Sequence, residues 1–275
     1  MVNAKVLFVS QEIVPFLDKS YIGFVSRQLP QCIQEKGNEI RVFMPRFGCI
    51  NERRNQLHEV IRFSGMNIII DDNDHPLIIK VASIQPARMQ IYFIDNEDYF
   101  QRKFIFHDKN NVFFEDNDER AMFFAKGVIE TVKKLSWNPN IVHCHGWMSS
   151  LVPLYIRTLY KDNPVFNETR IIYSLYNDEF SEELSKTFYK KIKSDSIKND
   201  IIDFYKKPTY ENLTKAAIEL SDGIIIGDTN VNSKYIDYAR DNGKPILDYQ
   251  PPETYIEAFS DFYDEILVQD SVLSE

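Results

Sequence analysis

The sequence lacks the patterns that mark the most familiar ways of binding a phosphate group, activating a serine or holding a catalytic zinc ion. It contains no glycine-rich phosphate loop of either standard pattern, no Gly-x-Ser-x-Gly turn and no His-Glu-x-x-His helix. Any activity must therefore use a different arrangement of residues.

Cysteine is scarce. Cys32, Cys49 and Cys144 are an odd, scattered set without Cys-x-x-Cys spacing. They predict neither a disulfide framework nor a thiolate metal site, and we expect them to be reduced and mostly buried.

Long apolar runs are missing too. No stretch approaches the roughly 18 apolar residues that a membrane helix needs, and residues 1–5 lead into a strand without a signal-peptide core. We expect a soluble, cytoplasmic protein that does not bind a membrane. The 41 acidic residues outnumber the 32 basic ones, for a net charge of −9, and the basic residues are dispersed. This balance disfavours nucleic acid as a partner.

Strands and helices alternate along the first part of the chain. Residues 5–10 and 39–45 read as buried strands, and residues 23–36 between them read as a helix that Pro30 should kink or divide. One βαβ unit is thus expected within 45 residues. Residues 51–95 contain strand-like runs with few helix signals, which predicts a β-hairpin or meander insertion. Its last strand should return to the central sheet. The strands expected in it are 60–63, 66–70, 77–84 and 90–94.

The rest of the chain continues the alternation. Helices are expected at 116–135, 151–160, 186–207, 210–220 and 232–242, with a closing amphipathic helix at about 253–268. Strands are expected at 141–145, 170–175, 222–227 and 245–248. The whole predicts an α/β fold in which residues 1–275 form one Rossmann-like domain, a parallel sheet flanked by helices with the β insertion at about 51–95.

The stretch from Ile141 to Ser150 is the strongest candidate for a site. A short apolar strand that ends in histidines and a glycine places polar groups at the carboxyl edge of the sheet, where open α/β folds hold ligands. His143 and His145 should point to one face, but no third ligand has a comparable position, so we expect no metal and predict a buried His143 and an edge His145. Trp147 is favoured as a core anchor over a ring that stacks on a sugar.

Several segments, in order, resemble the amino-terminal domain of bacterial glycogen synthase and plant starch synthase. They cover roughly residues 1 to 227 and include residues 5–12 (KVLFVSQE), 37–48 (GNEIRVFMPRFG), 92–100 (YFIDNEDYF), 116–120 (DNDER) and the Val-His-x-His segment at 142–145. The resemblance implies a GT-B glycosyltransferase that extends an α-1,4-glucan from ADP-glucose.

The chain departs from the family's pattern where the resemblance implies chemistry. Asp18 stands at the position of a phosphate-binding lysine, with Lys19 one place along, and of the loop's glycines only Gly23 matches. Gly146 replaces an aspartate and Met148 a histidine that faces the glucosyl unit, while His145 and Trp147 remain. The family's Ile-His-Asn is Leu175-Tyr176-Asn177. The candidate substrate-binding residues are Lys19, Gly23, His145, Gly146, Trp147, Tyr176 and Asn177.

Two hypotheses follow. Family enzymes close a cleft between two Rossmann domains, and residues 228–275 are too few for the second one. We therefore favour a homologue that is inactive as an isolated chain and binds α-glucan or a partner protein as a regulator. The alternative is an active synthase that uses ADP-glucose or UDP-glucose and obtains its donor-binding domain from a second chain. No other cofactor is expected.

Overall fold

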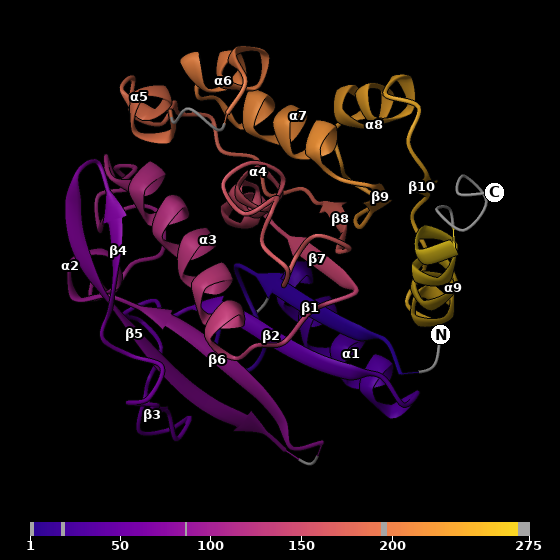
Figure 1. Ribbon diagram of the computed structural model, residues 1–275, viewed down its shortest axis with the longest axis horizontal. Coiled ribbons are helices and arrows are strands. Elements are labelled where there is room, and N and C mark those ends of the chain that lie inside the picture. Colours follow the sequence, from indigo (N-terminus) through magenta and orange to yellow (C-terminus); the bar gives the residue numbers. More distant parts are fainter. Residues whose placement is uncertain (1–2, 18–19, 86, 194–196, 269–275) are drawn as a thin grey trace.

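A twisted, mostly parallel sheet forms the centre of the protein (Figure 1). The computed structural model describes residues 3–17, 20–85, 87–193 and 197–268. The strand order is β10-β9-β8-β7-β1-β2-β6-β5-β3, and the strands from β10 to β6 run parallel. The α/β prediction is therefore confirmed. The parallel strands are β1 (Lys5–Ser10), β2 (Glu39–Pro45), β6 (Met89–Asp95), β7 (Ile141–His145), β8 (Arg170–Leu175), β9 (Gly223–Ile226) and β10 (Ile246–Leu247).

The strand order reverses at β1. The chain first places β2 on one side of β1, and much later places β7 on the other side, with Ser10 opposite His145 in the register. Such a reversal separates the connecting chains beyond the carboxyl ends of the two strands, and this leaves a crevice there. The Ile141–Ser150 stretch thus lies at the switch point, as the sequence predicts.

The insertion extends the sheet with antiparallel strands. β5 (Asn73–Ile84) pairs with β6, with the short β3 (His58–Glu59) and with β4 (Met66–Ile70). The predicted return of the insertion to the central sheet is confirmed, because β6 pairs with β2. The strand expected at 60–63 is wrong: the chain turns there, with Phe63 N and Ser64 N both donating to Val60 O. Ile61 is 82% exposed at this turn, whereas Phe63 is buried in the core.

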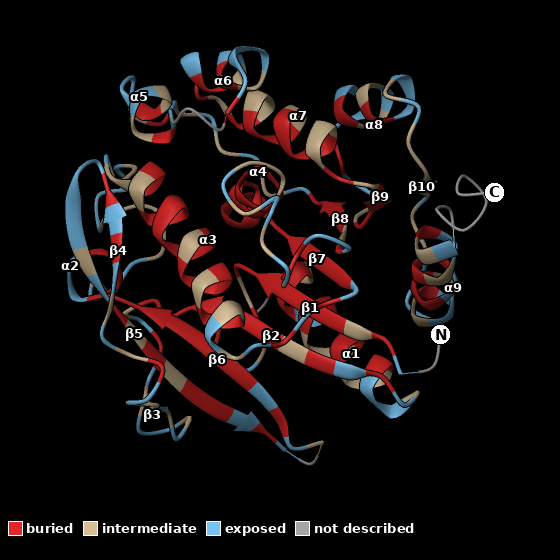
Figure 2. Ribbon diagram, viewed as in Figure 1, coloured by how far each residue is buried: buried red, intermediate tan, exposed pale blue. Residues whose placement is uncertain are grey.

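Helices cover both faces of the sheet. α3, α4 and α7 pack side by side on one face, and α1 packs with α9 on the other. Buried apolar residues form one continuous core between these layers, as the central strands in Figure 2 show. The helices are α1 (Tyr21–Glu35), α2 (Glu97–Phe100), α3 (Asn117–Lys134), η1 (Trp147–Ser149), α4 (Leu151–Arg157), α5 (Phe188–Ile192), α6 (Asn199–Lys206), α7 (Tyr210–Leu220), α8 (Ser233–Asp241) and α9 (Tyr255–Val268).

Three helices differ from the sequence prediction. Pro30 does not divide α1, which continues through it, because Pro30 is buried in the face that packs on the sheet and this packing offsets the lost backbone hydrogen bond. The helix expected at 186–207 is two helices, since Lys193 leaves helical geometry at the end of α5. The helix expected at 151–160 ends at Arg157, where Thr158 takes non-helical angles.

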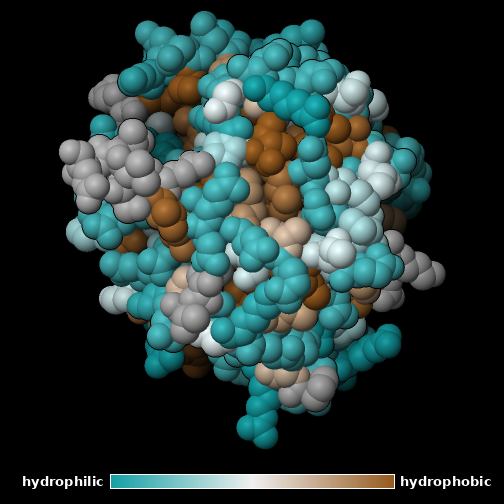
Figure 3. Space-filling view, turned by 90° about the vertical axis from the view of Figure 1, so that its right-hand side faces the viewer, coloured by the Kyte–Doolittle hydropathy of each residue, from teal (hydrophilic) through white to brown (hydrophobic). Residues whose placement is uncertain are grey.

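The α9 helix closes the fold. Five of its hydrophobic side chains are buried, in agreement with the amphipathic pattern expected at 253–268: Tyr255, Phe259, Phe262, Tyr263 and Ile266. Beside it, β10 is the last strand in the sheet order, and Ile246 and Leu247 remain partly exposed. Figure 3 views this side and shows hydrophobic residues in the middle of the face, with hydrophilic residues around them. Within the described ranges, no helix is long and apolar enough to cross a bilayer.

The side chain of Asn96 joins the insertion to the central sheet. Its Oδ1 accepts hydrogen bonds from Asp98 N (2.9 Å) and Tyr99 N (3.2 Å) and so caps α2, while its Nδ2 donates to Pro76 O (2.9 Å) on β5. The residue is buried. Removing this amide therefore leaves the first turn of α2, including the buried Tyr99 N, without its cap.

Asn96→Ala should lower the free energy of unfolding by about 1–2 kcal/mol, the cost of a lost helix cap. Urea denaturation followed by circular dichroism measures the change. Asn67→Ala is the matched control, since Asn67 is exposed on β4 and its side chain makes no hydrogen bond that the structure describes. An equal, small effect of both variants would contradict this role of Asn96.

Candidate functional site

A pocket of about 500 Å³ opens at the carboxyl edge of the sheet, beside the switch point. Its wall comes from residues that follow β1, β7, β8 and β9, from the start of α1 and from the loop between α2 and α3. The described residues that line it are Gln11, Glu12, Ser20, Tyr21, Ile22, Phe106, His107, Asn111, Phe113, Trp147, Tyr176, Asn177, Asp178, Glu179, Phe180, Ser181, Glu182 and Asp228.

Gly146 and Gln11 lock the floor of the pocket. Gln11 directly follows β1; its backbone N donates to His145 O (3.2 Å), and its side-chain Oε1 accepts from Met148 N (3.1 Å). Gly146 has φ +83°, and a Cβ there would lie 2.3 Å from Gln11 Cδ. The absence of a side chain at Gly146 therefore makes room for the Gln11 side chain.

Asp178 holds two elements together at the pocket wall. One carboxylate oxygen accepts from Trp147 N (2.7 Å) at the start of η1, and the other accepts from Tyr210 Oη (2.6 Å) on α7. Burial raises the pKa of Asp178 from 3.8 to about 6, the hydrogen bonds oppose this shift, and the nearby carboxylate of Glu12 adds to it.

Trp147 packs as a core anchor. Its side chain is 2% exposed, with the ring centroids of Phe106 and Phe180 at 4.8 and 5.0 Å. The aromatic wall continues outward, because Phe180 stacks on Phe113 at 5.2 Å. Phe106, Phe113 and Phe180 are partly exposed, so they present ring surface to the pocket where Trp147 does not.

A chain of buried polar groups lies behind the pocket. His145 Nδ1 is 2.8 Å from Tyr176 Oη, and the ring of His143 lies between Tyr263 Oη (2.6 Å) and Ser174 Oγ (2.7 Å). His145 ends β7 at the carboxyl edge of the sheet, as predicted, but it is as fully buried as His143, and its ring lies beside those of Phe8 and Tyr176. Burial lowers the pKa of His145 to about 3 and that of His143 well below its usual value, which keeps both rings neutral.

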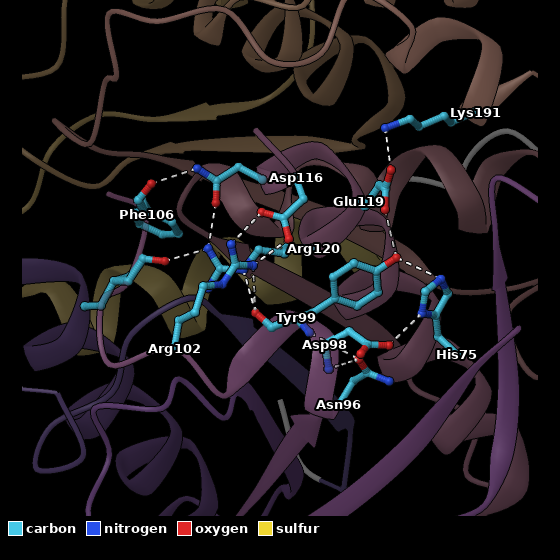
Figure 4. Close-up of polar contacts among 12 residues, drawn as sticks. His75, Asn96, Asp98, Tyr99, Arg102, Phe106, Asp116, Glu119, Arg120 and Lys191 are labelled. Carbon is cyan, nitrogen blue, oxygen red and sulfur yellow. Dashed lines mark hydrogen bonds and ion pairs between the residues drawn. The ribbon is translucent and has the colours of Figure 1, made fainter. Parts of the chain in front are cut away.

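The loop from 101 to 116, which forms one side of the pocket, is fastened by Arg120 of α3 (Figure 4). The buried guanidinium donates to Tyr99 O (2.9 Å), Ile105 O (2.6 Å) and Asn117 Oδ1 (2.6 Å). Asn117 in turn donates to Phe106 O (2.9 Å). Burial lowers the pKa of Arg120 to about 9. The Asp-Asn-Asp-Glu-Arg segment thus shapes the pocket from behind and does not enter it.

The pocket is acidic. The described part of its lining contains no lysine or arginine. Five carboxylates line it: Glu12, Asp178, Glu179, Glu182 and Asp228. His107 Nε2 lies 3.2 Å from Glu182 Oε1. Of the residues that the structure describes, no group of three or more His, Cys, Asp or Glu is placed to hold a metal ion.

The structure gathers only some of the residues that the sequence nominates. Trp147, Tyr176 and Asn177 line the pocket, while His145 and Gly146 lie directly behind its surface. Gly23 is buried in the first turn of α1, where its N donates to Ser20 Oγ (2.8 Å). Lys19 lies outside the described residues.

Sequence reasoning overlooked the acidic residues and the phenylalanines. Gln11 and Glu12 directly follow a predicted strand, so the rule that selected His145 and Trp147 could have selected them as well. Asp178 follows Asn177 by one residue and could have been found in the same way. No local pattern marks Phe106 or Phe113, because the contacts of Arg120 bring their loop to the pocket.

A parallel sheet with helices on both faces and a polar pocket at its switch point defines a Rossmann-like α/β protein. The chain matches the starch synthase catalytic domain over residues 5–234, and it therefore belongs to this glycosyltransferase family.

Relatives and a solved structure agree with this assignment. Glycogen synthase from Chlorobium limicola is 38% identical over 176 residues, covering 64% of this chain and 36% of that protein. Glycogen synthase from Chlorobium phaeovibrioides is 34% identical over 200 residues, covering 72% and 41%. The catalytic domain of starch synthase IV from Arabidopsis thaliana, bound to ADP and acarbose, superposes with a TM-score of 0.73 at 17% identity, covering 90% of this chain and 51% of that one. The chain thus spans about two fifths or less of the length of these glycogen synthases.

Gly146→Ala should destabilise the protein by more than the strain of a positive φ alone, since the new Cβ also meets Gln11. Gly243→Ala is the matched control: its φ is +72°, but nothing lies within 4 Å of the added Cβ. We expect a loss of about 1 kcal/mol for Gly243→Ala and at least about twice that for Gly146→Ala, measured by urea denaturation. Equal losses would show that the contact with Gln11 is unimportant.

The raised pKa of Asp178 predicts a pH dependence of stability. Between about pH 4 and 6 the carboxyl is protonated in the folded protein and ionised in the unfolded chain, so stability falls as pH rises through this range. The residue keeps some exposure, which reduces the effect to about 1–2 kcal/mol.

The free energy of unfolding of the wild type should therefore fall, relative to Asp178→Asn, by that amount between pH 4 and 6. Denaturant titrations at several pH values measure the difference. A constant difference between the two proteins would contradict the raised pKa.

Proposed function

We propose that this chain is a glycogen or starch synthase homologue that binds an α-glucan in the sheet-edge pocket and does not transfer glucose unaided. The observation that carries the proposal is the charge of the pocket: five carboxylates, with no lysine or arginine among the described lining residues. The lining bears on both the nucleotide-sugar donor and the glucan acceptor of the family's reaction.

On the donor side, the pocket disfavours a nucleotide diphosphate. Transition-state stabilisation in glycosyl transfer from such a donor requires positive charge or backbone N–H groups around the leaving diphosphate. Carboxylates instead repel it. The one matching glycine offers no help, because the N–H of Gly23 is already used by Ser20 Oγ to cap α1.

On the acceptor side, the lining fits an uncharged sugar chain. Carboxylates and the Asn111 and Asn177 amides accept hydrogen bonds from hydroxyl groups. The partly exposed rings of Phe106, Phe113 and Phe180 present apolar surface against which the C–H face of a sugar can pack. A pocket of about 500 Å³ is within the size range of small-ligand sites.

Calorimetry with two pairs of ligands tests whether the pocket binds glucan and whether it rejects the nucleotide donor. Maltoheptaose and acarbose should bind, and ADP and ADP-glucose should not. Phe113→Ala should weaken maltoheptaose binding by about tenfold, which corresponds to roughly 1.4 kcal/mol. Phe104→Ala is the matched control, since Phe104 is exposed on the same loop but does not line the pocket.

Two results would overturn the proposal. No affinity for malto-oligosaccharides would exclude the glucan-binding role and leave a protein partner as the target. Incorporation of glucose from ADP-glucose or UDP-glucose into glycogen, well above a blank, would show that the chain is an active transferase. In that case Lys19→Gln is the next variant to assay, because Lys19 is the nearest sequence counterpart of the family's phosphate-binding lysine.

A further inference from the structure

A second, smaller pocket lies at the opposite edge of the sheet. It sits at the amino ends of β2 and β6, next to the last turn of α1, and has a volume of about 160 Å³. The residues that line it are Gln34, Ile40, Arg41, Arg88, Met89, Gln90 and Tyr92.

The charge of this pocket is opposite to that of the acidic one. Two arginines and no carboxylate are among the seven lining residues, although the whole chain has a net charge of −9. Gln34 and Gln90 add amide donors and Tyr92 adds a phenol. A hollow lined by donors and positive charge in an acidic protein favours an anionic ligand.

Arg41 is held in place and keeps a donor free. Its Nη1 donates to Ile40 O (2.8 Å), its Nη2 lies 3.1 Å from Glu39 Oε1, and its guanidinium lies 5.2 Å from the ring centroid of Trp137. These contacts fix the orientation of the guanidinium. Its Nε is buried and has no hydrogen-bond partner in the described protein.

Arg88 supplies charge that no carboxylate offsets. It lies in the turn before β6, where its φ is +51°, and it makes no ion pair with any described residue. Glu39 partly neutralises Arg41, so Arg88 provides most of the net positive charge of the pocket.

We propose that this pocket binds a phosphate dianion, either inorganic phosphate or the phosphoryl group of a small phosphomonoester. Arginine is suited to such an ion, since its planar guanidinium donates two parallel hydrogen bonds to neighbouring oxygens. The volume corresponds to about five water molecules at roughly 30 Å³ each. That space admits a phosphoryl group and is well below the roughly 300–1,000 Å³ of ordinary ligand pockets.

Calorimetric titration in phosphate-free buffer tests the site, first with inorganic phosphate and then with glucose 1-phosphate. The wild type should bind with a saturable isotherm at millimolar concentrations. Arg88→Gln and Gln90→Glu should each weaken binding by about tenfold or more, because the first removes a charged donor and the second adds a repelling carboxylate. Tighter binding of glucose 1-phosphate would identify a phosphomonoester as the ligand, and equal or weaker binding would identify inorganic phosphate.

Arg53→Gln is the matched control, since Arg53 is exposed and does not line this pocket; it should bind like the wild type. Absence of saturable binding, or the same affinity in all four proteins, would overturn the proposal. Binding of acetate as tightly as phosphate would also overturn it. Malto-oligosaccharide affinity should be unchanged in Arg88→Gln, because the two pockets lie at opposite edges of the sheet. A failure of the phosphate proposal would therefore not count against the proposed glucan site.

Discussion

The parallel pairing of β1 with β7 is the constraint on which the acidic pocket depends. With Ser10 opposite His145, the next residue on each strand brings Gln11 against Gly146. The Gln11 side chain then reaches Met148 N, and the η1 turn starts where Asp178 can accept a hydrogen bond from Trp147 N. A shift of one residue in this register would reverse the faces of the side chains and separate all of these partners.

The charges of the protein are sorted between the two edges of its sheet. The carboxyl ends of the strands carry five carboxylates in a pocket with aromatic walls, whereas the amino ends of β2 and β6 carry two arginines in a smaller one. Because the two linings carry opposite charge, the two pockets should favour different ligands. Uncharged hydroxyl groups suit the first, since they can donate to carboxylates without the cost of bringing like charges together. An oxyanion suits the second.

Much of the fold follows from residue patterns. Apolar runs bounded by Gly and Pro predict the parallel strands, and the return of residues 90–94 to the central sheet follows from the alternation of strand and helix. The strand expected at 60–63 fails because the chain turns after Val60: Val60 N donates to Ile79 O of β5, but Phe63 N and Ser64 N donate back to Val60 O, and tertiary context outweighs the β propensity of the run. The break between α5 and α6 falls in a charged segment whose helical pattern carries no clear stop signal.

The site is less predictable than the fold because its surface is assembled from distant segments. The sequence indicates the strand ends near Trp147 and Tyr176, but Phe106 and Phe113 reach the pocket only through the contacts of Arg120 with the 101–116 loop. Burial likewise cannot be read from a two-residue spacing. His145 looks like an exposed strand end, but the rings of Phe8 and Tyr176, distant in sequence, lie beside it and it is fully buried.

Several residues of the pocket region stabilise the fold through contacts inside the protein. Arg120 and the Asp116–Glu119 segment fasten a loop, and Trp147 anchors the core, so these positions stabilise the fold whether or not sugar is transferred. Gly146 and Tyr176 are likewise engaged in internal packing or hydrogen bonding, with Gln11 and His145 respectively. Polar groups that bond to each other inside the protein are not free to stabilise charge on a substrate. The contacts of Gly146 and Tyr176 thus complete the interior of this pocket, and its surface is formed mainly by the aromatic rings and carboxylates around them.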